Sequence, residues 1–271
     1  MKINGETKII GFFGATYKTS KMYAMYNVVF ENLELNFVYV PFVVEDIKKG
    51  VEAIRSLDIH AVGVTIPFKI SIMKHLDKLD DNAKRIGAVN VVLNKNGKLI
   101  GGNTDGKGGV KALKEKTEVK DKKIILLGAG GAARAIAFAI KDEGGKLTVL
   151  NRTVEDAKEL AQTVDCQFGG LEKLSELLPT TDILINSTSV GMSPDIDQSL
   201  VNKELLRRGL TVMDIVSNPK ETKLLKEAKA IGCQVVFADR MLLWQGVLKF
   251  KLYTGIEPPV SVMEEALKDS P

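Results

Sequence analysis

Apolar and polar positions form alternating blocks along the chain, with short apolar runs separated by longer amphipathic stretches. Short apolar runs predict strands, and apolar residues that recur every three or four positions predict helices. The two patterns take turns through the first hundred residues, which is typical of an α/β domain. Pro41 has no backbone N–H, so we expect it to close the second strand. The pattern predicts strands at 9–13, 37–40, 61–64, 89–93 and 99–101, and helices at 21–32, 45–57, 70–75 and 81–86.

A second α/β pattern follows a predicted helix near 107–115. Its first strand, 124–127, is an unbroken apolar run, as expected of a central strand that is buried on both faces of a parallel sheet. A glycine-rich loop and a helix with an apolar stripe over 133–140 come next. The chain turns helical again from Arg240, and Pro258-Pro259 precedes a last amphipathic helix. Further strands are predicted at 147–150, 183–185, 211–215 and 234–237, with a helix at 220–231.

Composition narrows the class of protein. The 271 residues are 45% hydrophobic and 27% charged, a balance typical of soluble globular proteins. The net charge of +4 is small and the lysines are scattered, so we expect no nucleic-acid partner. Cys166 and Cys233 fit no metal spacing, and His60 and His75 are the two histidines, so we expect no metal site. No signal peptide or membrane-length apolar run is visible, and we expect a cytoplasmic protein with reduced thiols.

The glycine-rich loop predicts a dinucleotide site. Residues 128–133 read G-x-G-x-x-A directly after the buried strand. In this motif the first glycine makes a tight turn and the second lets the backbone approach a pyrophosphate, which then faces the helix N-terminus. The alternative is a glycine-rich turn that binds nothing. The complete strand–loop–helix–strand context favours the nucleotide site.

The residues at the end of the next strand indicate which dinucleotide the site binds. An NAD site usually places Asp or Glu about 20 residues beyond the glycines, to hold the ribose 2′-hydroxyl. Here the chain reads Asn151-Arg152-Thr153. The planar cation of Arg152 suits a 2′-phosphate, so we expect NADP. Asp156 lies close by in sequence and would weaken phosphate binding if it faced the same site.

Three stretches outside the nucleotide loop carry candidate chemistry: residues 63–69 (GVTIPFK), 87–90 (GAVN) and 103–106 (NTDG). The first delivers Lys69 at the carboxyl end of a buried strand, where open α/β sheets bind ligands. Reduction of a ketone needs a proton donor, which a partly desolvated Lys69 would supply with Asp105 adjusting its pKa. Asn90 and Asp105 would orient neighbouring hydroxyls. The alternative is a surface lysine and a turn aspartate that never meet.

Together these segments resemble the shikimate dehydrogenase family, NADP-dependent enzymes of aromatic amino acid biosynthesis that interconvert 3-dehydroshikimate and shikimate. GAGGAAR, NRT and INSTSVGM (185–192) resemble its glycine loop, its 2′-phosphate clasp and the loop under the nicotinamide. The resemblance implies that Lys69 and Asp105 form the catalytic pair. Its implied substrate contacts are Ser20, Thr65, Asn90 and Gln245. The expected cofactor contacts are Gly128, Ala129, Gly130, Gly131, Ala132, Asn151, Arg152, Thr153, Thr188, Ser189, Val190 and Met213.

The resemblance also implies a domain plan of two α/β domains. The first is a substrate domain at 1–105, onto which the last helices, 240–271, fold back. The second is a Rossmann-type, doubly wound NADP-binding domain at 106–239.

Several residues depart from the family pattern, and they gather around the expected position of the substrate carboxylate. We therefore expect the redox chemistry to be kept and the acid-group pocket to be rebuilt, with the guanidinium of Arg240 as a compensating carboxylate ligand. The alternative is a solvent-facing Arg240 and ordinary shikimate binding through Ser20 and Thr65. In the serine-rich loop, Met22 and Tyr23 stand where the family has a serine and a proline. Further along, the family has an asparagine, a tyrosine and a glycine at the positions of Gly63, Ser217 and Arg240.

Other functions stay open. A quinate or other polyol-acid dehydrogenase fits the same scaffold, and so does a catalytically idle NADP-binding paralogue. A folate-linked dehydrogenase fits less well, because NTDG and INSTSVGM both match the shikimate pattern. We expect a small-molecule substrate and a monomer or homodimer.

Overall fold

The computed structural model describes residues 3–15 and 20–269, which form two compact units. Unit 1 comprises Met1–Thr104 and Gln245–Pro271, and unit 2 comprises Asp105–Trp244. The predicted boundaries differ slightly, because Asp105 and residues 240–244 lie in unit 2. Asp105 is the first residue of helix α5 (Asp105–Lys114), and Arg240 and Trp244 of helix α10 (Ala238–Thr254) both donate to Glu115 beside it.

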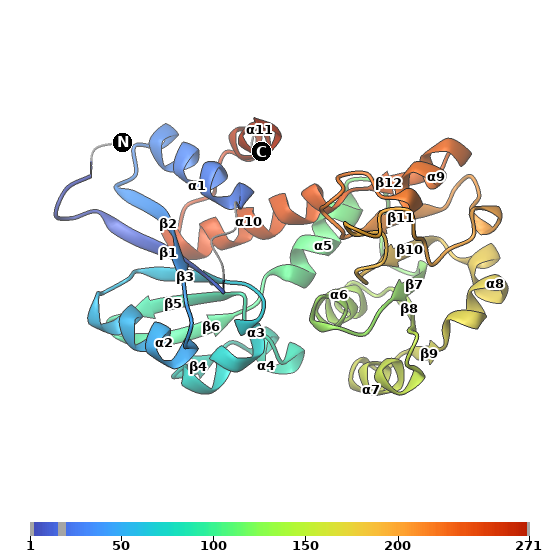
Figure 1. Ribbon diagram of the computed structural model, residues 1–271, viewed down its shortest axis with the longest axis horizontal. Coiled ribbons are helices and arrows are strands. Elements are labelled where there is room, and N and C mark those ends of the chain that lie inside the picture. The colour runs from blue at the N-terminus through green and yellow to red at the C-terminus, as the bar shows by residue number, and fades with distance from the viewer. Residues whose placement is uncertain (1–2, 16–19, 270–271) are drawn as a thin grey trace. The chain divides into compact units, whose positions relative to one another are not determined.

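Unit 1 contains a mixed six-stranded sheet in the order β2-β1-β3-β5-β6-β4 (Figure 1). Strands β1, β2 and β3 are parallel, whereas β5 runs antiparallel to both β3 and β6. Asn96 and Gly97 join β5 to β6 with positive φ at both positions, as a tight hairpin turn requires. The strands are β1 Lys8–Gly14, β2 Phe37–Val43, β3 Ala61–Val64, β4 Lys78–Leu79, β5 Val91–Lys95 and β6 Lys98–Gly102.

The helices of unit 1 cover this sheet. The helix predicted at 21–32, the strand at 61–64 and the helix at 81–86 are confirmed to the residue. The prediction that Pro41 ends its strand is wrong. Strand β2 continues to Val43 because it lies at the sheet edge, where a missing N–H costs no ladder bond. The helices are α1 Lys21–Asn32, α2 Ile47–Ser56, α3 Phe68–Ser71, α4 Asp81–Ile86 and α11 Val260–Asp269, with a 3-10 turn at Ile72–His75 and the part of α10 from Gln245 onward.

Aromatic side chains fill the side of the unit 1 sheet that faces α1 and α10. Tyr26 of α1 contacts Tyr39 of β2 at a ring separation of 4.7 Å and stacks on Phe250 of α10. The Tyr26 hydroxyl donates to the carbonyl of Gly246 over 3.2 Å. These contacts fix the C-terminal half of α10 against α1.

Unit 2 contains a six-stranded parallel sheet in the order β12-β11-β10-β7-β8-β9 (Figure 1), which confirms the doubly wound domain. Residues 124–127 are all buried, as predicted for its central strand. The strands are β7 Lys123–Leu127, β8 Lys146–Leu150, β9 Gln167–Gly169, β10 Ile183–Asn186, β11 Thr211–Asp214 and β12 Gln234–Val236. The helices are α5, α6 Gly131–Asp142, α7 Val154–Val164, α8 Leu174–Leu177, α9 Lys223–Ile231 and residues 238–244 of α10, with 3-10 turns at Leu171–Lys173, Leu178–Thr180 and Lys203–Leu205.

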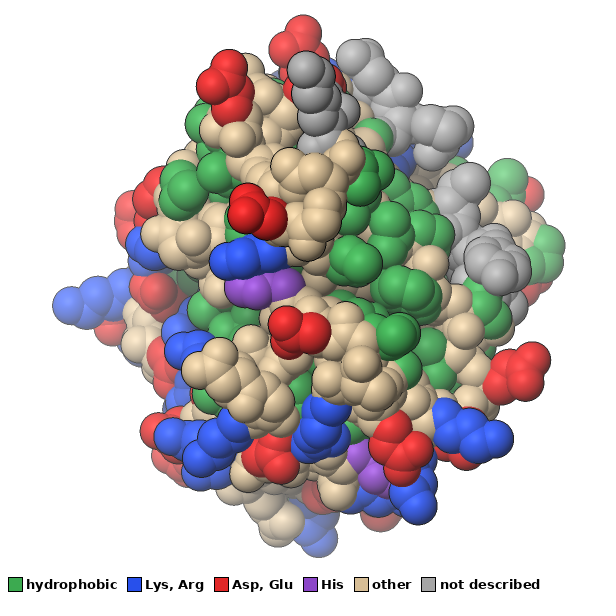
Figure 2. Space-filling model, turned by 90° about the vertical axis from the view of Figure 1, so that its left-hand side faces the viewer, with side chains coloured by type: hydrophobic (Ala, Val, Ile, Leu, Met, Phe, Trp, Pro, Cys, Tyr) green, Lys and Arg blue, Asp and Glu red, His purple; other side chains and the backbone are tan. Residues whose placement is uncertain are grey.

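Acidic and basic side chains are interspersed over the left and lower parts of the face shown in Figure 2, whereas hydrophobic side chains gather above and to the right of its centre. Within residues 3–15 and 20–269, no helix is both long and apolar enough to span a membrane.

Candidate active site

The glycine loop of unit 2 has the geometry of an anion cradle. Gly128 follows strand β7 with a φ of +105°, and a Cβ there would lie 2.9 Å from Ser187 Oγ, so the position requires glycine. A Cβ at Gly130 or Gly131 would meet nothing within 4 Å. Gly130 is the N-cap of α6 and makes no side-chain bond, so no capping side chain occupies the first N–H groups of this helix. Such a helix N-terminus suits a pyrophosphate.

A cavity of about 370 Å³ adjoins this loop. Eight of the expected cofactor contacts line it: Ala129, Gly130, Asn151, Arg152, Thr153, Thr188, Ser189 and Val190. The sequence interpretation missed the apolar lining residues Leu171 and Leu200. Gly128, Gly131 and Ala132 belong to the loop and first turn of α6 beside it. Met213 is fully buried inside β11 and does not line the cavity, and its contact with the cofactor stays a prediction.

The cavity is lined by both Arg152, which suits a 2′-phosphate, and Asp156, which would weaken phosphate binding. Arg152 and Thr153 are exposed, and Asp156 is also a lining residue. The amide of Asn151 donates to the Thr153 carbonyl over 3.0 Å and to the Asp156 carboxylate over 3.3 Å. Asn151 therefore shapes the turn that presents the cation and holds the nearby carboxylate.

Asn186 builds the loop that forms the other side of the cavity. Its side-chain oxygen accepts from both the backbone and the hydroxyl of Thr188, at 3.1 and 2.7 Å. Its amide donates to Asp214 over 3.0 Å. Asp214 is fully buried, and this burial raises its pKa although hydrogen bonds from Thr222, Val216 and Asn186 oppose the shift. Sequence reasoning found the loop but not this network behind it.

In unit 1, the predicted lysine segment begins at the end of β3. Thr65 accepts a backbone hydrogen bond from Phe68, and the intervening Ile66–Pro67 peptide bond is cis. Lys69 lies in α3 and is half-buried, and its carbonyl accepts from the N–H of Val89 over 2.8 Å. This bond attaches the lysine segment to the residues that lead into β5.

Asn90 and Gln245 are connected through Thr104. Asn90 is fully buried, accepts from the N–H of Thr104 over 3.0 Å and donates to its hydroxyl over 3.1 Å. The Thr104 hydroxyl also donates to the carbonyl of Gln245 over 3.5 Å. The structure thus brings together two predicted substrate residues within unit 1. Asp105, buried as the first residue of α5, belongs to unit 2, and its pairing with Lys69 stays a prediction.

The expected carboxylate loop is described in part. Residues 16–19 lie outside the described residues. Ser20 caps α1 by accepting from the N–H of Met22 over 3.3 Å. Met22 is buried, with its sulfur 3.6 Å from where a Cβ on Gly246 would stand. A Cβ on Gly63 would stand 2.9 Å from the hydroxyl of Tyr39.

Arg240 has a different partner from the one that its sequence position suggested. Its Nε and Nη2 donate to the two carboxylate oxygens of Glu115 over 2.7 and 2.5 Å. The indole of Trp244 donates to the same carboxylate over 2.6 Å. The guanidinium makes this two-point pair inside unit 2, and its contact with the substrate stays a prediction.

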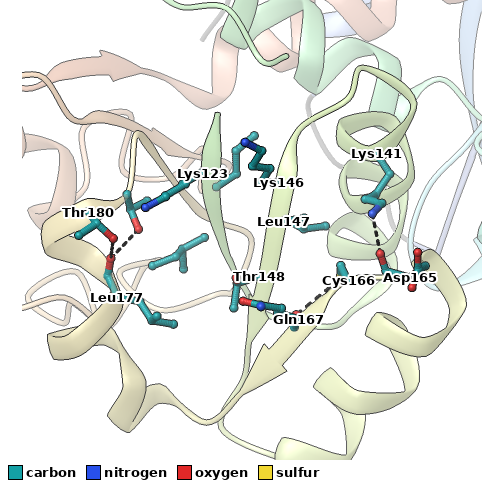
Figure 3. A pocket seen from close by; sticks show the side chains of 13 residues that line it. Lys123, Lys141, Lys146, Leu147, Thr148, Asp165, Cys166, Gln167, Leu177 and Thr180 are labelled. Carbon is teal, nitrogen blue, oxygen red and sulfur yellow. Dashed lines mark hydrogen bonds between the residues drawn. The ribbon is translucent and has the colours of Figure 1, made fainter. Parts of the chain in front are cut away.

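A larger hollow, of about 650 Å³, lies at the amino ends of β7 and β8 (Figure 3). None of the predicted site residues lines it. Lys141 donates there to the carbonyl of Asp165, and burial raises the pKa of Cys166 to about 11. Ligands of open parallel sheets bind at the carboxyl ends of the strands, so this hollow is not the nucleotide site.

Comparison with known proteins agrees with this geometry. Family models match residues 12–92 (shikimate dehydrogenase substrate binding domain), 111–231 (shikimate/quinate 5-dehydrogenase) and 240–268 (shikimate 5′-dehydrogenase C-terminal domain). The chain belongs to the shikimate dehydrogenase family. It is 44% identical over 278 residues to the shikimate dehydrogenase (NADP(+)) of Methanocaldococcus jannaschii, covering 98% of each chain.

Solved structures of the family are similar over the whole chain. A shikimate dehydrogenase in complex with NADP+ has a TM-score of 0.93 at 42% identity, with 99% of this chain and 97% of that chain covered. The shikimate 5-dehydrogenase of Thermus thermophilus, in complex with NADP(H) and shikimate, has a TM-score of 0.89 at 36% identity, covering 97% and 100%.

Proposed function

We propose that this protein is an NADP-dependent shikimate dehydrogenase that reversibly reduces the ketone of 3-dehydroshikimate to the alcohol of shikimate, a step of aromatic amino acid biosynthesis. The observation that carries the proposal is the cavity beside the α6 N-terminus, edged by Arg152 and Thr153, in a chain that keeps the lysine, asparagine and aspartate motifs of the family. We also propose that it works in the cytoplasm as a monomer or homodimer.

The residues of unit 2 fit NADP. The open first turn of α6 suits the pyrophosphate, and the exposed guanidinium of Arg152 with the hydroxyl of Thr153 suits the 2′-phosphate. Bound NADPH would supply the hydride for the carbonyl carbon. Asp156 opposes the 2′-phosphate, because its carboxylate lines the same cavity.

The proton has a proposed source in unit 1. As hydride adds to the carbonyl carbon, the Lys69 ammonium would donate a proton to the developing alkoxide. Asp105 would hold and charge-match the ammonium, and the Asn90 amide would orient a neighbouring ring hydroxyl. The buried bonds of Asn90 to Thr104 support this orienting role, because they fix the amide before the substrate binds.

The test is an NADP+ reduction assay with shikimate and quinate, each also with NAD+. We expect the highest kcat/KM for shikimate with NADP+. Lys69→Ala should lower kcat at least a hundredfold with little change in KM, the signature of an interaction made in the transition state. Lys74→Ala is a matched control, because Lys74 is exposed and follows in the same segment.

Other outcomes would lead to different functions. A higher kcat/KM for quinate would make the protein a quinate dehydrogenase, in keeping with the family model that carries both names. Binding of NADPH without turnover of any cyclic hydroxy acid would indicate a non-catalytic paralogue. An unchanged kcat for Lys69→Ala would remove this lysine as the proton donor.

A further inference from the structure

Unit 1 contains a lysine whose side chain is almost entirely buried. Lys249 lies in the part of α10 that belongs to this unit and is 4% exposed. Lysine is rarely buried to this degree, because removing an ammonium from water costs free energy. Its Nζ donates to the side-chain oxygen of Gln245 over 3.5 Å. The ammonium therefore lies beside a residue that the family resemblance assigns to the substrate.

The position of Lys249 on its helix directs the ammonium toward the expected substrate residues. Gln245 and Lys249 are four residues apart and therefore share one face of α10. Side chains in helices lean toward the N-terminus, so Lys249 reaches back over the turn that carries Gln245. The Gln245 carbonyl accepts from Thr104, which in turn is bonded to Asn90. The buried cation is thus bonded to the side chain of Gln245, whose backbone carbonyl belongs to the Asn90–Thr104–Gln245 hydrogen-bond group.

Two described positions of the same unit differ from the family pattern around the expected substrate carboxylate. Met22 places a thioether where the family pattern has a serine hydroxyl, and Gly63 places no side chain where it has an asparagine amide. Tyr39 and Tyr253 occupy the space beside Gly63. Arg240, the cation that the sequence suggested as a replacement, is paired with Glu115 in unit 2.

We propose that Lys249 is the residue that binds the carboxylate of the substrate. This inference rests on the proposed function and assigns the acid-group contact within the same substrate pocket. A desolvated ammonium and a carboxylate form a strong, charge-assisted hydrogen bond, which replaces several neutral donors with one cation. Lys249 would therefore select cyclic hydroxy acids over neutral relatives of the same ring, such as esters.

The test compares shikimate with its methyl ester at saturating NADP+. Lys249→Met keeps the length and apolar stem of the side chain and removes the charge. We expect the KM for shikimate to rise about ten- to a hundredfold, the range for loss of a hydrogen bond to a charged group, with kcat little changed. The KM for the ester should stay the same, so the preference for the acid disappears. Lys251→Met is the matched control, because Lys251 is an exposed lysine on the same helix that pairs with Glu257.

Three results would overturn the assignment: an unchanged KM for shikimate, an equal loss for acid and ester, or the same effect in Lys251→Met. If Lys249→Met does not fold in a thermal unfolding assay, Lys249→Gln gives the same comparison with a polar neutral side chain. If the wild-type protein turns over neither compound, the proposed function fails. Calorimetric titration of shikimate into the NADP+-saturated wild type and Lys249→Met then tests the binding role alone, and equal binding or no binding to the wild type rejects it.

Discussion

The hydroxyl of Tyr253 lies buried beside the backbone of Gly63, 3.3 Å from where a Cβ on that glycine would stand. Among the residues that the structure describes, this hydroxyl has no hydrogen-bond partner. Burial also raises its pKa well above the usual range for tyrosine, so the hydroxyl stays protonated and neutral. Burying an unpaired hydroxyl costs free energy of folding.

Removing that hydroxyl should therefore stabilise the protein. We expect Tyr253→Phe to raise the free energy of unfolding by about 1 kcal/mol, since it deletes a buried polar atom that forms no bond. Tyr26→Phe is the matched control, because its hydroxyl donates to Gly246 and its loss should destabilise the protein by about 1 kcal/mol. Urea unfolding measures both. A loss of stability in Tyr253→Phe would show that the hydroxyl has a partner.

Two glycines of the nucleotide loop should respond differently to alanine. Gly128 has positive φ and a tight contact with Ser187, so Gly128→Ala should lower the free energy of unfolding by about 2 kcal/mol or more. Gly131 has neither feature, so Gly131→Ala at the start of α6 should change the free energy of unfolding by less than about 0.5 kcal/mol. Thermal unfolding of the cofactor-free protein measures the difference. Equal effects would contradict the geometry of the loop.

Replacing Arg240 with alanine should change stability and leave substrate binding intact. The guanidinium makes a two-point pair with Glu115, and each partner is partly exposed. Exposure screens the pair, so we expect a loss of about 1 kcal/mol in the free energy of unfolding. The KM for shikimate should not change. A severalfold rise in the KM for shikimate, with the KM for the cofactor unaffected, would show that Arg240 contacts the substrate.

The same pair predicts a dependence of stability on pH. Burial alone would raise the pKa of Glu115, but the hydrogen bonds from Arg240 and Trp244 outweigh it and hold the pKa below its ordinary value. A lowered folded-state pKa contributes stability above the unfolded-state pKa of about 4.3, and this contribution is lost as the pH falls through the folded-state value. Wild type should therefore exceed Glu115→Gln in the free energy of unfolding at pH 7, with the gap closing below about pH 4. A constant gap would rule out this linkage.

Cofactor preference should follow Arg152. Replacing it with glutamate introduces repulsion toward the 2′-phosphate and a partner for a ribose 2′-hydroxyl. We expect kcat/KM for NADP+ to fall about a hundredfold, with a smaller change or a gain for NAD+. Arg134→Glu is the charge-matched control, since Arg134 pairs with Glu159 on α7 and is not a lining residue of the cavity. An unchanged ratio of the two cofactors would place the 2′-phosphate elsewhere.

The sequence predicted elements well where the pattern depends on local chemistry. The helix at 21–32 begins after a capping serine, and the strand at 61–64 is apolar throughout. Strands β4 and β9 escaped prediction because two or three residues carry no recognisable period. Pro41 misled the prediction because its effect depends on whether the strand lies at an edge.

Two cations show where sequence reasoning ends for the site. Arg240 and Glu115 are 125 positions apart, so only the folded chain reveals their pairing. Lys249 occurs two residues before Lys251 in a predicted helix, where a lysine ordinarily indicates a solvated face. Its burial depends on how α10 packs in unit 1, which no local pattern encodes.

Unit 2 is continuous in the chain, whereas unit 1 is assembled from both ends of it. During synthesis the ribosome therefore finishes the nucleotide-binding part first. Tyr26 and Phe30 are synthesised early, but Phe250 of α10, which packs on both, is synthesised only near the end. Until then, the nascent chain lacks the helix that covers these aromatic side chains. Truncated or stalled products would therefore aggregate or recruit a chaperone at this stage of synthesis.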